Sequence, residues 1–322
     1  MKDAAPHHRN TPMRECELII VGAGVAGLTA ATCAGRHGLD CVVVEQLAAG
    51  GQIANAERIE NFPGFPQGIG GHELGPLLQE QAEAAGATFV LDSVERLETD
   101  GDYRIVRGAG ESLRAPAIII AAGSRLRALP VAGAEKFLGK GVSHCASCDG
   151  ALFAGQDVCV VGGGDSAFDE ALVLAAHASR VTILHRSPRP DAQRALSKRV
   201  GACARIEIIP EAVVEDILGE GAVSAVRWRH AATGAVHTRA VRGVFAYVGL
   251  EPNTAFLGDM VALDAAGHIE TDTMMRTSLR GVFAAGDIRR NSVAQLAAAA
   301  GDGATAAVAA FRYLRNERGN GG

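Results

Sequence analysis

The sequence contains no apolar run of the roughly 18 residues that a membrane-spanning helix requires. Its first apolar stretch, from Leu18 to Ala34, follows Glu15 and Glu17 and is interrupted by glycines, which is not the pattern of a signal peptide. The 31 basic residues are outnumbered by 36 acidic ones and form no cluster of the kind that binds nucleic acid. We therefore expect no membrane or nucleic-acid partner, and a cytoplasmic location.

Aromatic residues are also scarce, at 4% of the chain, whereas glycine occurs 40 times. This balance is typical of nucleotide-binding α/β proteins, in which tight turns and close backbone contacts are common. The seven cysteines show no disulfide framework. Five of them are expected to be buried thiols in a reducing compartment: Cys16, Cys33, Cys41, Cys159 and Cys203. Cys145 and Cys148 form a C-x-x-C, a pattern that by itself fits a metal clip, a structural disulfide or a redox-active pair.

A dinucleotide-binding pattern lies near the N-terminus, in ELIIVGAGVAGLTAATCAGRHGLDCVVVEQ. It predicts a buried strand, a glycine turn, a helix and a second strand that ends in Glu45. Gly22 turns the chain, Gly24 lets the backbone approach a pyrophosphate, and Gly27 lets the helix pack on the strand. Glu45 follows by about 20 residues, where a carboxylate accepts the ribose hydroxyls of a dinucleotide. The pattern favours FAD at this first site.

The same pattern recurs in QDVCVVGGGDSAFDEALVLAAHASRVTILHRS. Its turn residues Gly162, Gly164 and Ala167 have the spacing of the first set, and His185 has the same offset from Gly164 as Glu45 has from Gly24. Arg186 follows in place of an acid and is suited to a 2′-phosphate, which Glu45 would repel. This second site therefore suits NADP(H), if it binds a nucleotide.

Three short apolar patterns end in small residues, as strands do whose carboxyl ends line a ligand crevice: residues 115–124, 243–253 and 281–289. Asp287 follows Gly286 at the end of the last one, where a flavin ribityl or pyrophosphate would lie; a simple turn aspartate is the alternative. The chain thus returns to its first domain after completing the second. We predict an α/β fold with two Rossmann-like dinucleotide-binding domains.

Taken together, the motifs of this chain resemble those of the low-molecular-weight thioredoxin reductases and their relatives, from about Cys16 to Leu314. In chain order these motifs are Gly22 to Gly27, Gly50-Gly51-Gln52-Ile53, Glu60-Asn61-Phe62-Pro63-Gly64, Cys145 to Asp149, Gly162 to Ala167, and Gly286-Asp287. The resemblance implies a discontinuous FAD domain, residues 14–122 and 251–316, around an inserted NAD(P)H-type domain, residues 123–250, that carries the C-x-x-C. It also implies a homodimer. Residues 1–13 and 317–322 are expected to be disordered termini.

The resemblance favours a redox role for Cys145 and Cys148. Zinc would need two further ligands, and no second C-x-x-C exists, while a structural disulfide does not suit a cytosolic chain. By resemblance, Cys148 lies near the flavin, and Cys145 exchanges electrons with an external disulfide. Asp149 is suited to move the proton of thiol-disulfide exchange, although it could instead stabilise a helix start. The remaining residues that the resemblance assigns to FAD are Gly51, Gln52, Asn61, Gly286, Asp287 and Gln295.

Two departures from the family pattern affect nucleotide and electron delivery. The family follows its second nucleotide motif with His-Arg-Arg and a further arginine, but here Ser187 and Asp191 occupy the two later arginine positions. Charge-assisted arginine contacts are worth about 1.5 to 3 kcal/mol each, so NADPH binding is expected to weaken unless Arg189 compensates, or the chain uses NADH. The family's Arg-Gln-Ala near the flavin is replaced by Ala294-Gln295-Leu296.

Three functions are compatible with these features. The first is an FAD-dependent thioredoxin reductase-like enzyme, in which NAD(P)H reduces the cysteine pair through FAD and the pair reduces thioredoxin or another disulfide. The second is a dithiol oxidase that forms a disulfide in a small natural product, with O2 as acceptor and no need for NADPH. The third is a non-catalytic flavin redox sensor, which would need neither an intact C-x-x-C nor an intact FAD motif.

Overall fold

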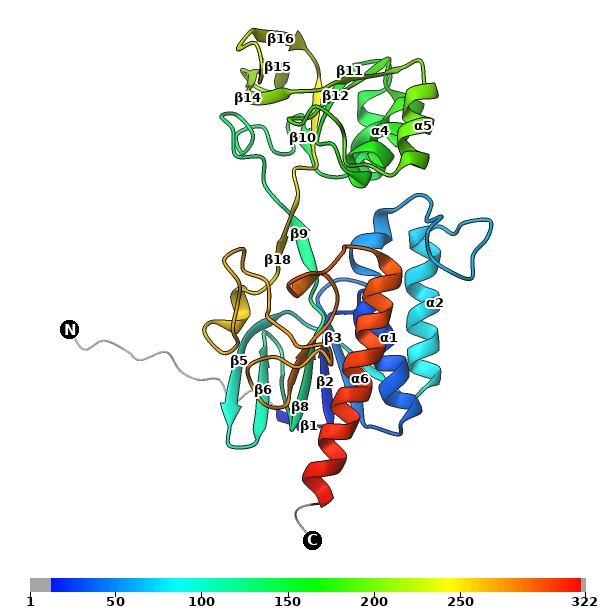
Figure 1. The fold of residues 1–322 in the computed structure, drawn as a ribbon, viewed down its shortest axis with the longest axis vertical. Coiled ribbons are helices and arrows are strands. Elements are labelled where there is room, and N and C mark those ends of the chain that lie inside the picture. The colour runs from blue at the N-terminus through cyan, green and yellow to red at the C-terminus, as the bar shows by residue number, and fades with distance from the viewer. Residues whose placement is uncertain (1–12, 320–322) are drawn as a thin grey trace, which may run out of the picture. The chain divides into compact units, whose positions relative to one another are not determined.

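The computed structural model describes residues 13–319 of the chain (Figure 1). These residues form two compact units, one containing the described residues up to Arg125 and from Glu251 onward, the other containing Leu126–Leu250. Both divisions fall inside short strands, β9 (Ser124–Leu126) and β18 (Leu250–Pro252), which pair with each other. The sequence places the first division earlier, after residue 122.

The termini differ in part from the expectation of disorder. Met13 begins strand β1 (Met13–Glu15), and helix α6 (Leu296–Gly319) continues through residues 317–319. Secondary structure thus extends into four positions of the predicted termini, and the expectation of disorder stays a prediction. The rest of the predicted termini, residues 1–12 and 320–322, lie outside the described residues.

The first unit is built on a five-stranded parallel sheet with strand order β19-β8-β2-β3-β4. Its central strands are continuous apolar runs, and every residue of β2 and β8 is buried because both faces of the sheet are covered. The strands are β2 (Leu18–Val21), β3 (Cys41–Glu45), β4 (Thr88–Leu91), β8 (Ala117–Ile120) and β19 (Val282–Ala284).

Helices cover one face of this sheet, and a second sheet covers the other (Figure 1). The helices are α1 (Val25–Arg36), α2 (Gly71–Ala84) and α6, and α1 packs extensively against both others. On the opposite face, β1 and three antiparallel-paired strands form a sheet of order β1-β7-β6-β5. These three strands are β5 (Val94–Asp100), β6 (Tyr103–Gly108) and β7 (Ser112–Ala115).

The second unit repeats this plan with a five-stranded parallel sheet of order β10-β17-β11-β12-β13. The strands are β10 (Val142–Ser143), β11 (Asp157–Val161), β12 (Arg180–Leu184), β13 (Ile206–Ile209) and β17 (Gly243–Ala246). Helices α4 (Asp165–His177) and α5 (Arg194–Ala202) pack on one face. An antiparallel sheet packs on the other: β14 (Ala212–Gly219), β15 (Val223–His230) and β16 (Val236–Ala240).

Short helices complete the two units. The four-residue helix α3 (Ala146–Asp149) carries most of the C-x-x-C, and the 3-10 helix η2 (Gly150–Phe153) follows it directly. The other 3-10 helices are η1 (Gly51–Asn55), η3 (Ala255–Leu257) and η4 (Gly286–Ile288). Over residues 13–319, no helix has the combined length and apolar character needed to cross a membrane.

Candidate functional site: two dinucleotide cradles and a redox-active disulfide

The first glycine turn joins β2 to α1 and leaves room for a ligand at one position only. Gly22 has φ +103°, and a Cβ there would overlap the carbonyl of Ala121; a Cβ on Gly27 would overlap the carbonyl oxygen of Gly22. A Cβ on Gly24, by contrast, would meet no atom within 4 Å. The turn is therefore closed against neighbouring backbone at Gly22 and Gly27 and open at Gly24, where α1 begins.

Glu45, at the end of β3, faces this turn. One carboxylate oxygen accepts a hydrogen bond from the backbone amide of Ala23 at 2.8 Å, and the other accepts from the Leu47 amide at 3.0 Å. No side chain caps the start of α1, and its first turn contains no acidic residue. Helix amides without a capping acceptor bind phosphate, and a fixed carboxylate nearby binds ribose. The residues therefore fit an adenine dinucleotide such as FAD.

The Gly51-Gln52 segment lies against the same turn. The amide of Gly50 donates to the Ala23 carbonyl at 2.8 Å, and Gly50 forms an isolated parallel β-bridge with Gly24. The side-chain amide of Gln52 donates to both the carbonyl and the hydroxyl oxygen of Ser124, at 2.8 and 3.0 Å. The segment is thus held beside the glycine turn by contacts that its motif did not reveal.

Asn61 and Gln295, two further residues assigned to FAD, lie far apart in the sequence but contact each other in the first unit. The side-chain amide of Asn61 donates to Oε1 of Gln295 at 3.1 Å, and the Gln295 carbonyl accepts from the Ala299 amide at the start of α6. Ala294, which stands where the family has an arginine, adopts a left-handed φ of 48°. Gln295 therefore ends a tight turn directly before the helix.

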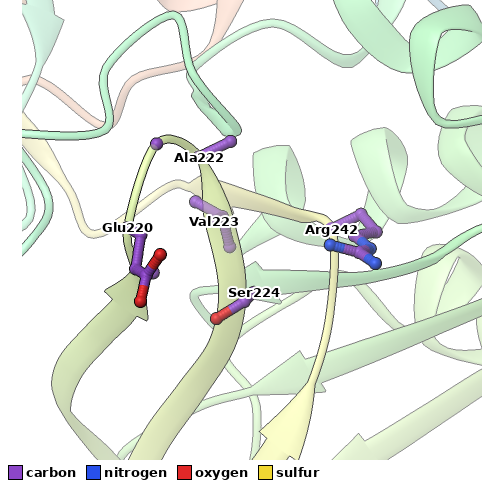
Figure 2. A pocket seen from close by; sticks show the side chains of 7 residues that line it. Glu220, Ala222, Val223, Ser224 and Arg242 are labelled. Atoms are coloured by element: carbon purple, nitrogen blue, oxygen red, sulfur yellow. The ribbon is translucent and has the colours of Figure 1, made fainter.

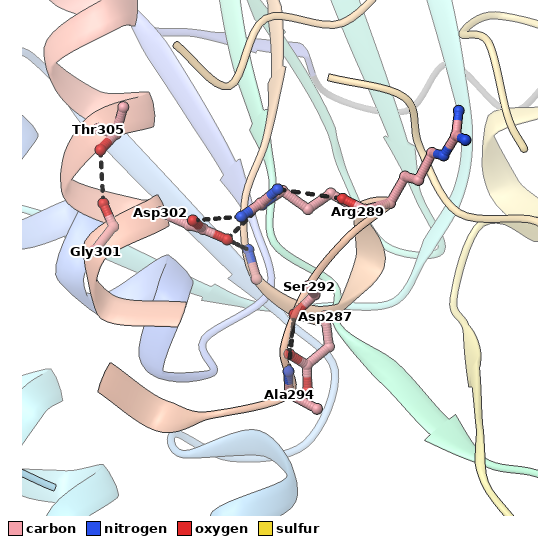
Figure 3. A network of polar contacts seen from close by, with 9 residues as sticks. Asp287, Arg289, Ser292, Ala294, Gly301, Asp302 and Thr305 are labelled. Atoms are coloured by element: carbon pink, nitrogen blue, oxygen red, sulfur yellow. Dashed lines mark hydrogen bonds and ion pairs between the residues drawn. The ribbon is translucent and has the colours of Figure 1, made fainter. Parts of the chain in front are cut away.

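Asp287 is held within a polar network at the end of β19 (Figure 3). Its Oδ1 accepts a hydrogen bond from the Ser292 hydroxyl at 2.8 Å, and the same hydroxyl accepts from the Ala294 amide at 3.2 Å. The amide of Gly286 donates to Asp302 on α6 at 3.2 Å. The structure thus assigns fixed positions to Gly286 and Asp287, through partners that the sequence analysis did not identify.

The second glycine turn, between β11 and α4, repeats the geometry of the first. A Cβ on Gly162 would overlap the carbonyl of Tyr247, whereas a Cβ on Gly164 would meet nothing within 4 Å. Ala167 is buried in the first turn of α4, whose start no side chain caps. The turn residues therefore leave the same opening for a nucleotide phosphate.

His185 lies behind this turn, one residue after β12 ends. Its side chain is buried, and neither ring nitrogen has a hydrogen-bond partner within the described chain. Burial lowers the pKa of His185, against the opposing charge of Asp191, so the ring is uncharged at neutral pH. A buried imidazole whose two nitrogens lack a protein partner is unusual, because buried polar atoms are normally hydrogen-bonded.

The loop after His185 is tied back to the glycine turn. The amides of Asp191 and Ala192 both donate to the Gly163 carbonyl, and Gln193 donates to the carboxylate of Asp165 from its backbone and its side chain at 2.7 and 2.6 Å. Arg186 and Arg189 on this loop are exposed, and neither pairs with another described residue. The loop therefore presents two uncommitted guanidinium groups, together with the Asp191 carboxylate.

The cysteines of the C-x-x-C are joined as a disulfide. Cys145 caps helix α3, and its Sγ accepts a hydrogen bond from the Cys148 amide at 3.1 Å. Cys148 is exposed and Cys145 half-buried. The Asp149 carboxylate, in the same helix, accepts from the Ser143 hydroxyl at 2.6 Å, and the Ser143 oxygen in turn accepts from the Cys145 amide at 3.1 Å. Asp149 is thus connected to Cys145 through a single hydroxyl.

A carboxylate that the sequence analysis missed also contacts this helix. Glu170 on α4 accepts a hydrogen bond from the Ala146 amide at 2.7 Å and a second from the Ser147 amide. It faces the buried side chain of Tyr247. No motif marks Glu170, because it is one of several acids in an ordinary amphipathic helix and only the packing of α4 beneath α3 brings it to the cysteines.

Comparison with known proteins decides the family. Residues 16–303 match the model of the pyridine nucleotide-disulphide oxidoreductases. The chain belongs to this family. It is 39% identical over 299 residues to a thioredoxin reductase of Listeria innocua, covering 92% of this chain and 93% of that protein. A thioredoxin reductase of Treponema pallidum is 40% identical, covering 92% and 97% of the two chains.

A solved structure agrees with this assignment. The crystal structure of Lactococcus lactis thioredoxin reductase in its FR conformation has a TM-score of 0.91 and 37% identity, covering 94% of this chain and 99% of that one. The resemblance and the α/β fold with two Rossmann-like domains are confirmed, and the chain is an FAD-dependent disulfide oxidoreductase. The dithiol oxidase and sensor alternatives receive no support from these relatives.

The other cysteines of this oxidoreductase are free thiols. Cys16, Cys41 and Cys159 are buried, while Cys33 and Cys203 are half-buried rather than buried as expected. Burial raises the pKa of Cys16 and of Cys159 to about 12 and that of Cys41 to about 11. Thiols this resistant to ionisation do not take part in thiol-disulfide exchange.

Metal ligands and pockets were the remaining candidates for a functional site. Within residues 13–319, no group of three or more His, Cys, Asp or Glu side chains is placed to hold a metal ion. A pocket of about 540 Å³ is lined by the turn between β14 and β15 and by Arg242 (Figure 2). No residue predicted for the site lines this pocket.

Proposed function

We propose that this chain reduces thioredoxin or a thioredoxin-like protein, with electrons that pass from NAD(P)H through FAD to the Cys145–Cys148 disulfide. The observation that carries the proposal is the occurrence in one chain of this disulfide, in which Cys148 is exposed and Cys145 half-buried, and of two open glycine turns. The relatives of highest identity described above are thioredoxin reductases. Two nucleotide cradles and one dithiol are the parts that such a reduction requires.

The first cradle would hold FAD. Its glycine turn and the start of α1 would bind the pyrophosphate, and Glu45 the ribose. Gly51, Gln52, Asn61, Gly286, Asp287 and Gln295 are the other residues that we assign to FAD. When bound, the flavin supplies the two-electron carrier between nicotinamide and disulfide.

The second cradle would hold the nicotinamide nucleotide. Gly162, Gly164 and Ala167 would form the turn on which its pyrophosphate binds, and Arg186 is the cation suited to a 2′-phosphate. Asp191 and Asp165 place negative charge near the same turn. We therefore expect NADPH to be accepted through Arg186, with weaker discrimination against NADH than a cluster of three arginines would give.

The two cysteines of the dithiol would have different roles. Cys145 would attack the disulfide of the protein substrate, which breaks that bond and forms a mixed disulfide with Cys145. Cys148 would then attack Cys145, which releases the substrate as a dithiol and restores the Cys145–Cys148 bond. Asp149, held by Ser143, would exchange protons with the sulfurs.

A homodimer and a cytoplasmic location belong to the same proposal. The dimer is supported only by the family resemblance. The location is supported by the five cysteines that stay free thiols in the described chain, which suits a reducing compartment.

An anaerobic titration tests the direction of electron flow. The FAD-bound protein is mixed with NADPH, then separately with NADH, and flavin absorbance is followed; oxidised thioredoxin is added afterwards. We expect NADPH to bleach the flavin and thioredoxin to restore its colour. If neither nucleotide bleaches the flavin and a small dithiol does, with Cys148→Ser abolishing that response, the reductase proposal is wrong and the dithiol oxidase is right.

A further inference from the structure

The short helix that carries the cysteines divides its first backbone amides between two acceptors. The amides of Ala146 and Ser147 donate to the carboxylate of Glu170, and the amide of Cys148 donates to Sγ of Cys145. Amides at a helix start stabilise negative charge, and in redox-active C-x-x-C helices this lowers the pKa of a cysteine. Here a carboxylate from another helix has taken two of those donors.

Glu170 also brings negative charge next to the backbone of the cysteine helix. Its partner Ala146 follows Cys145 directly in the chain and is buried. The groups that face Glu170 are Tyr247 from the segment after β17 and Asp169 from its own helix, while Asp149 on α3 faces Tyr247. Within residues 13–319, none of these groups is a cation, so the carboxylate charge is not offset on the sides that they occupy.

We propose that Glu170 is a positioning residue of the redox centre: it anchors the start of α3 and opposes negative charge on Cys145 in the reduced enzyme. The inference rests on the redox role proposed for Cys145 and Cys148. Reduction breaks the S–S bond with two electrons and leaves two thiols after uptake of two protons, or one thiol and one thiolate after uptake of one. A carboxylate beside Cys145 favours the outcome in which this sulfur keeps its proton.

Glu170 is half-buried where α4 contacts α3. Burial raises the pKa of Glu170, opposed by the hydrogen bonds from the amides of Ala146 and Ser147. Burial and the charge of Glu170 also raise the pKa of Tyr247. Glu170 and Tyr247 therefore lie directly behind the cysteine helix, and replacing the carboxylate removes a negative charge beside Cys145.

The test is the pH dependence of alkylation of Cys145. FAD-bound wild-type and Glu170→Gln proteins are reduced with dithiothreitol, freed of it under anaerobic conditions and treated with iodoacetamide between pH 5 and 10; modified Cys145 is quantified by mass spectrometry. Glutamine keeps an acceptor oxygen for the Ala146 amide but removes the charge. We expect the apparent pKa of Cys145 to fall by about one unit in Glu170→Gln, a tenfold gain in thiolate below that pKa.

Two further variants separate charge from structure. Asp169→Asn removes the neighbouring carboxylate of α4 and is expected to leave the Cys145 profile unchanged. Glu170→Asp keeps a charge and is expected to stay close to the wild-type profile. The proposal is overturned if Glu170→Gln does not shift the profile, or if Glu170→Asp shifts it as far as Glu170→Gln. The assay uses no nucleotide and no thioredoxin, so its outcome is independent of the direction of electron flow.

Discussion

Arg289 forms a bidentate ion pair with Asp302: its Nε donates to Oδ2 at 2.5 Å and its Nη2 donates to Oδ1 at 2.8 Å (Figure 3). The same carboxylate accepts the amide of Gly286, so one acid on α6 fixes the turn that carries Asp287. Asp302 is buried, and its partner's side chain is only 18% exposed. The ion pair therefore links the last helix of the chain to the end of β19.

Removal of this carboxylate is expected to destabilise the first unit and loosen its FAD site. Asp302→Ala leaves the half-buried Arg289 without its carboxylate partner and with only the Arg290 carbonyl to accept from its guanidinium. Breaking a buried ion pair costs about 3 to 5 kcal/mol in the free energy of unfolding, so we expect a loss approaching this range. Urea denaturation of the apoprotein measures the loss, and the rate of FAD release from the loaded protein measures the effect on the site.

Glu270→Gln is the matched control for that variant. It breaks the pair between Glu270 and Arg290, whose side chains are both about half exposed. Exposed ion pairs contribute roughly 0.2 to 1 kcal/mol, so this variant should unfold close to the wild type. Equal losses in the two variants would show that burial does not set the strength of the Arg289–Asp302 pair.

The first glycine turn allows ligand binding to be separated from folding. An alanine at Gly27 would overlap the carbonyl of Gly22, whereas an alanine at Gly24 meets no protein atom within 4 Å. We expect Gly27→Ala to lower the free energy of unfolding of the apoprotein by about 2 kcal/mol or more, or to prevent folding. Gly24→Ala should change the stability of the apoprotein by about 1 kcal/mol at most, yet bind FAD at least about tenfold more weakly, because its Cβ enters the space of the pyrophosphate.

Urea denaturation of the apoproteins and fluorescence titration with FAD provide the two measurements. If Gly24→Ala binds FAD as tightly as the wild type, the pyrophosphate does not lie against this turn.

What the sequence predicts well here is local. Gly22, Gly24 and Glu45 belong to one strand-turn-helix-strand unit, so their spacing alone determines that they meet. Glu170 and Asp302 were not predicted, because their partners Ala146 and Gly286 lie on other elements and the contacts depend on how helices pack. Helix interiors tolerate many acids, and nothing in their periodicity distinguishes a solvated acid from one that caps a neighbouring helix.

Nucleotide choice is expected to depend on Arg186. Because the pKa of His185 is lowered by burial, its ring is neutral at pH 7 and the exposed Arg186 carries the charge near the second turn. Loss of a charge-assisted contact costs about 1.5 to 3 kcal/mol, so Arg186→Ala should raise KM for NADPH roughly tenfold to a hundredfold. KM for NADH, which has no 2′-phosphate, should change little.

Asp191→Asn tests the opposing charge on the same loop. It should lower KM for NADPH a few-fold and leave KM for NADH unchanged, measured as steady-state reduction of thioredoxin. Arg189→Ala serves as the control for Arg186→Ala. If Arg189→Ala raises KM for NADPH as much as Arg186→Ala does, or more, then Arg189 is the residue that binds the 2′-phosphate.

The buried thiols predict a loss of stability at alkaline pH. Burial raises the pKa of Cys159 from 9.0 to about 12 in the folded chain. Below pH 9 the thiol is protonated in both states and its contribution to stability is complete. As pH rises from 9 towards 12, only the unfolded chain loses this proton, so the free energy of unfolding falls by about 1.4 kcal/mol per pH unit for each such thiol.

Cys159→Ala and Val160→Ala, neighbours on β11 that are both fully buried, isolate this effect. In a background with Cys145 and Cys148 changed to serine, so that no disulfide exchanges, urea denaturation is compared at pH 8 and pH 10. The background protein and Val160→Ala should lose about 1.4 kcal/mol more than Cys159→Ala between these pH values. Other ionising groups cancel in the comparison, so equal losses in all three proteins would mean that Cys159 ionises in the folded chain as easily as in the unfolded one.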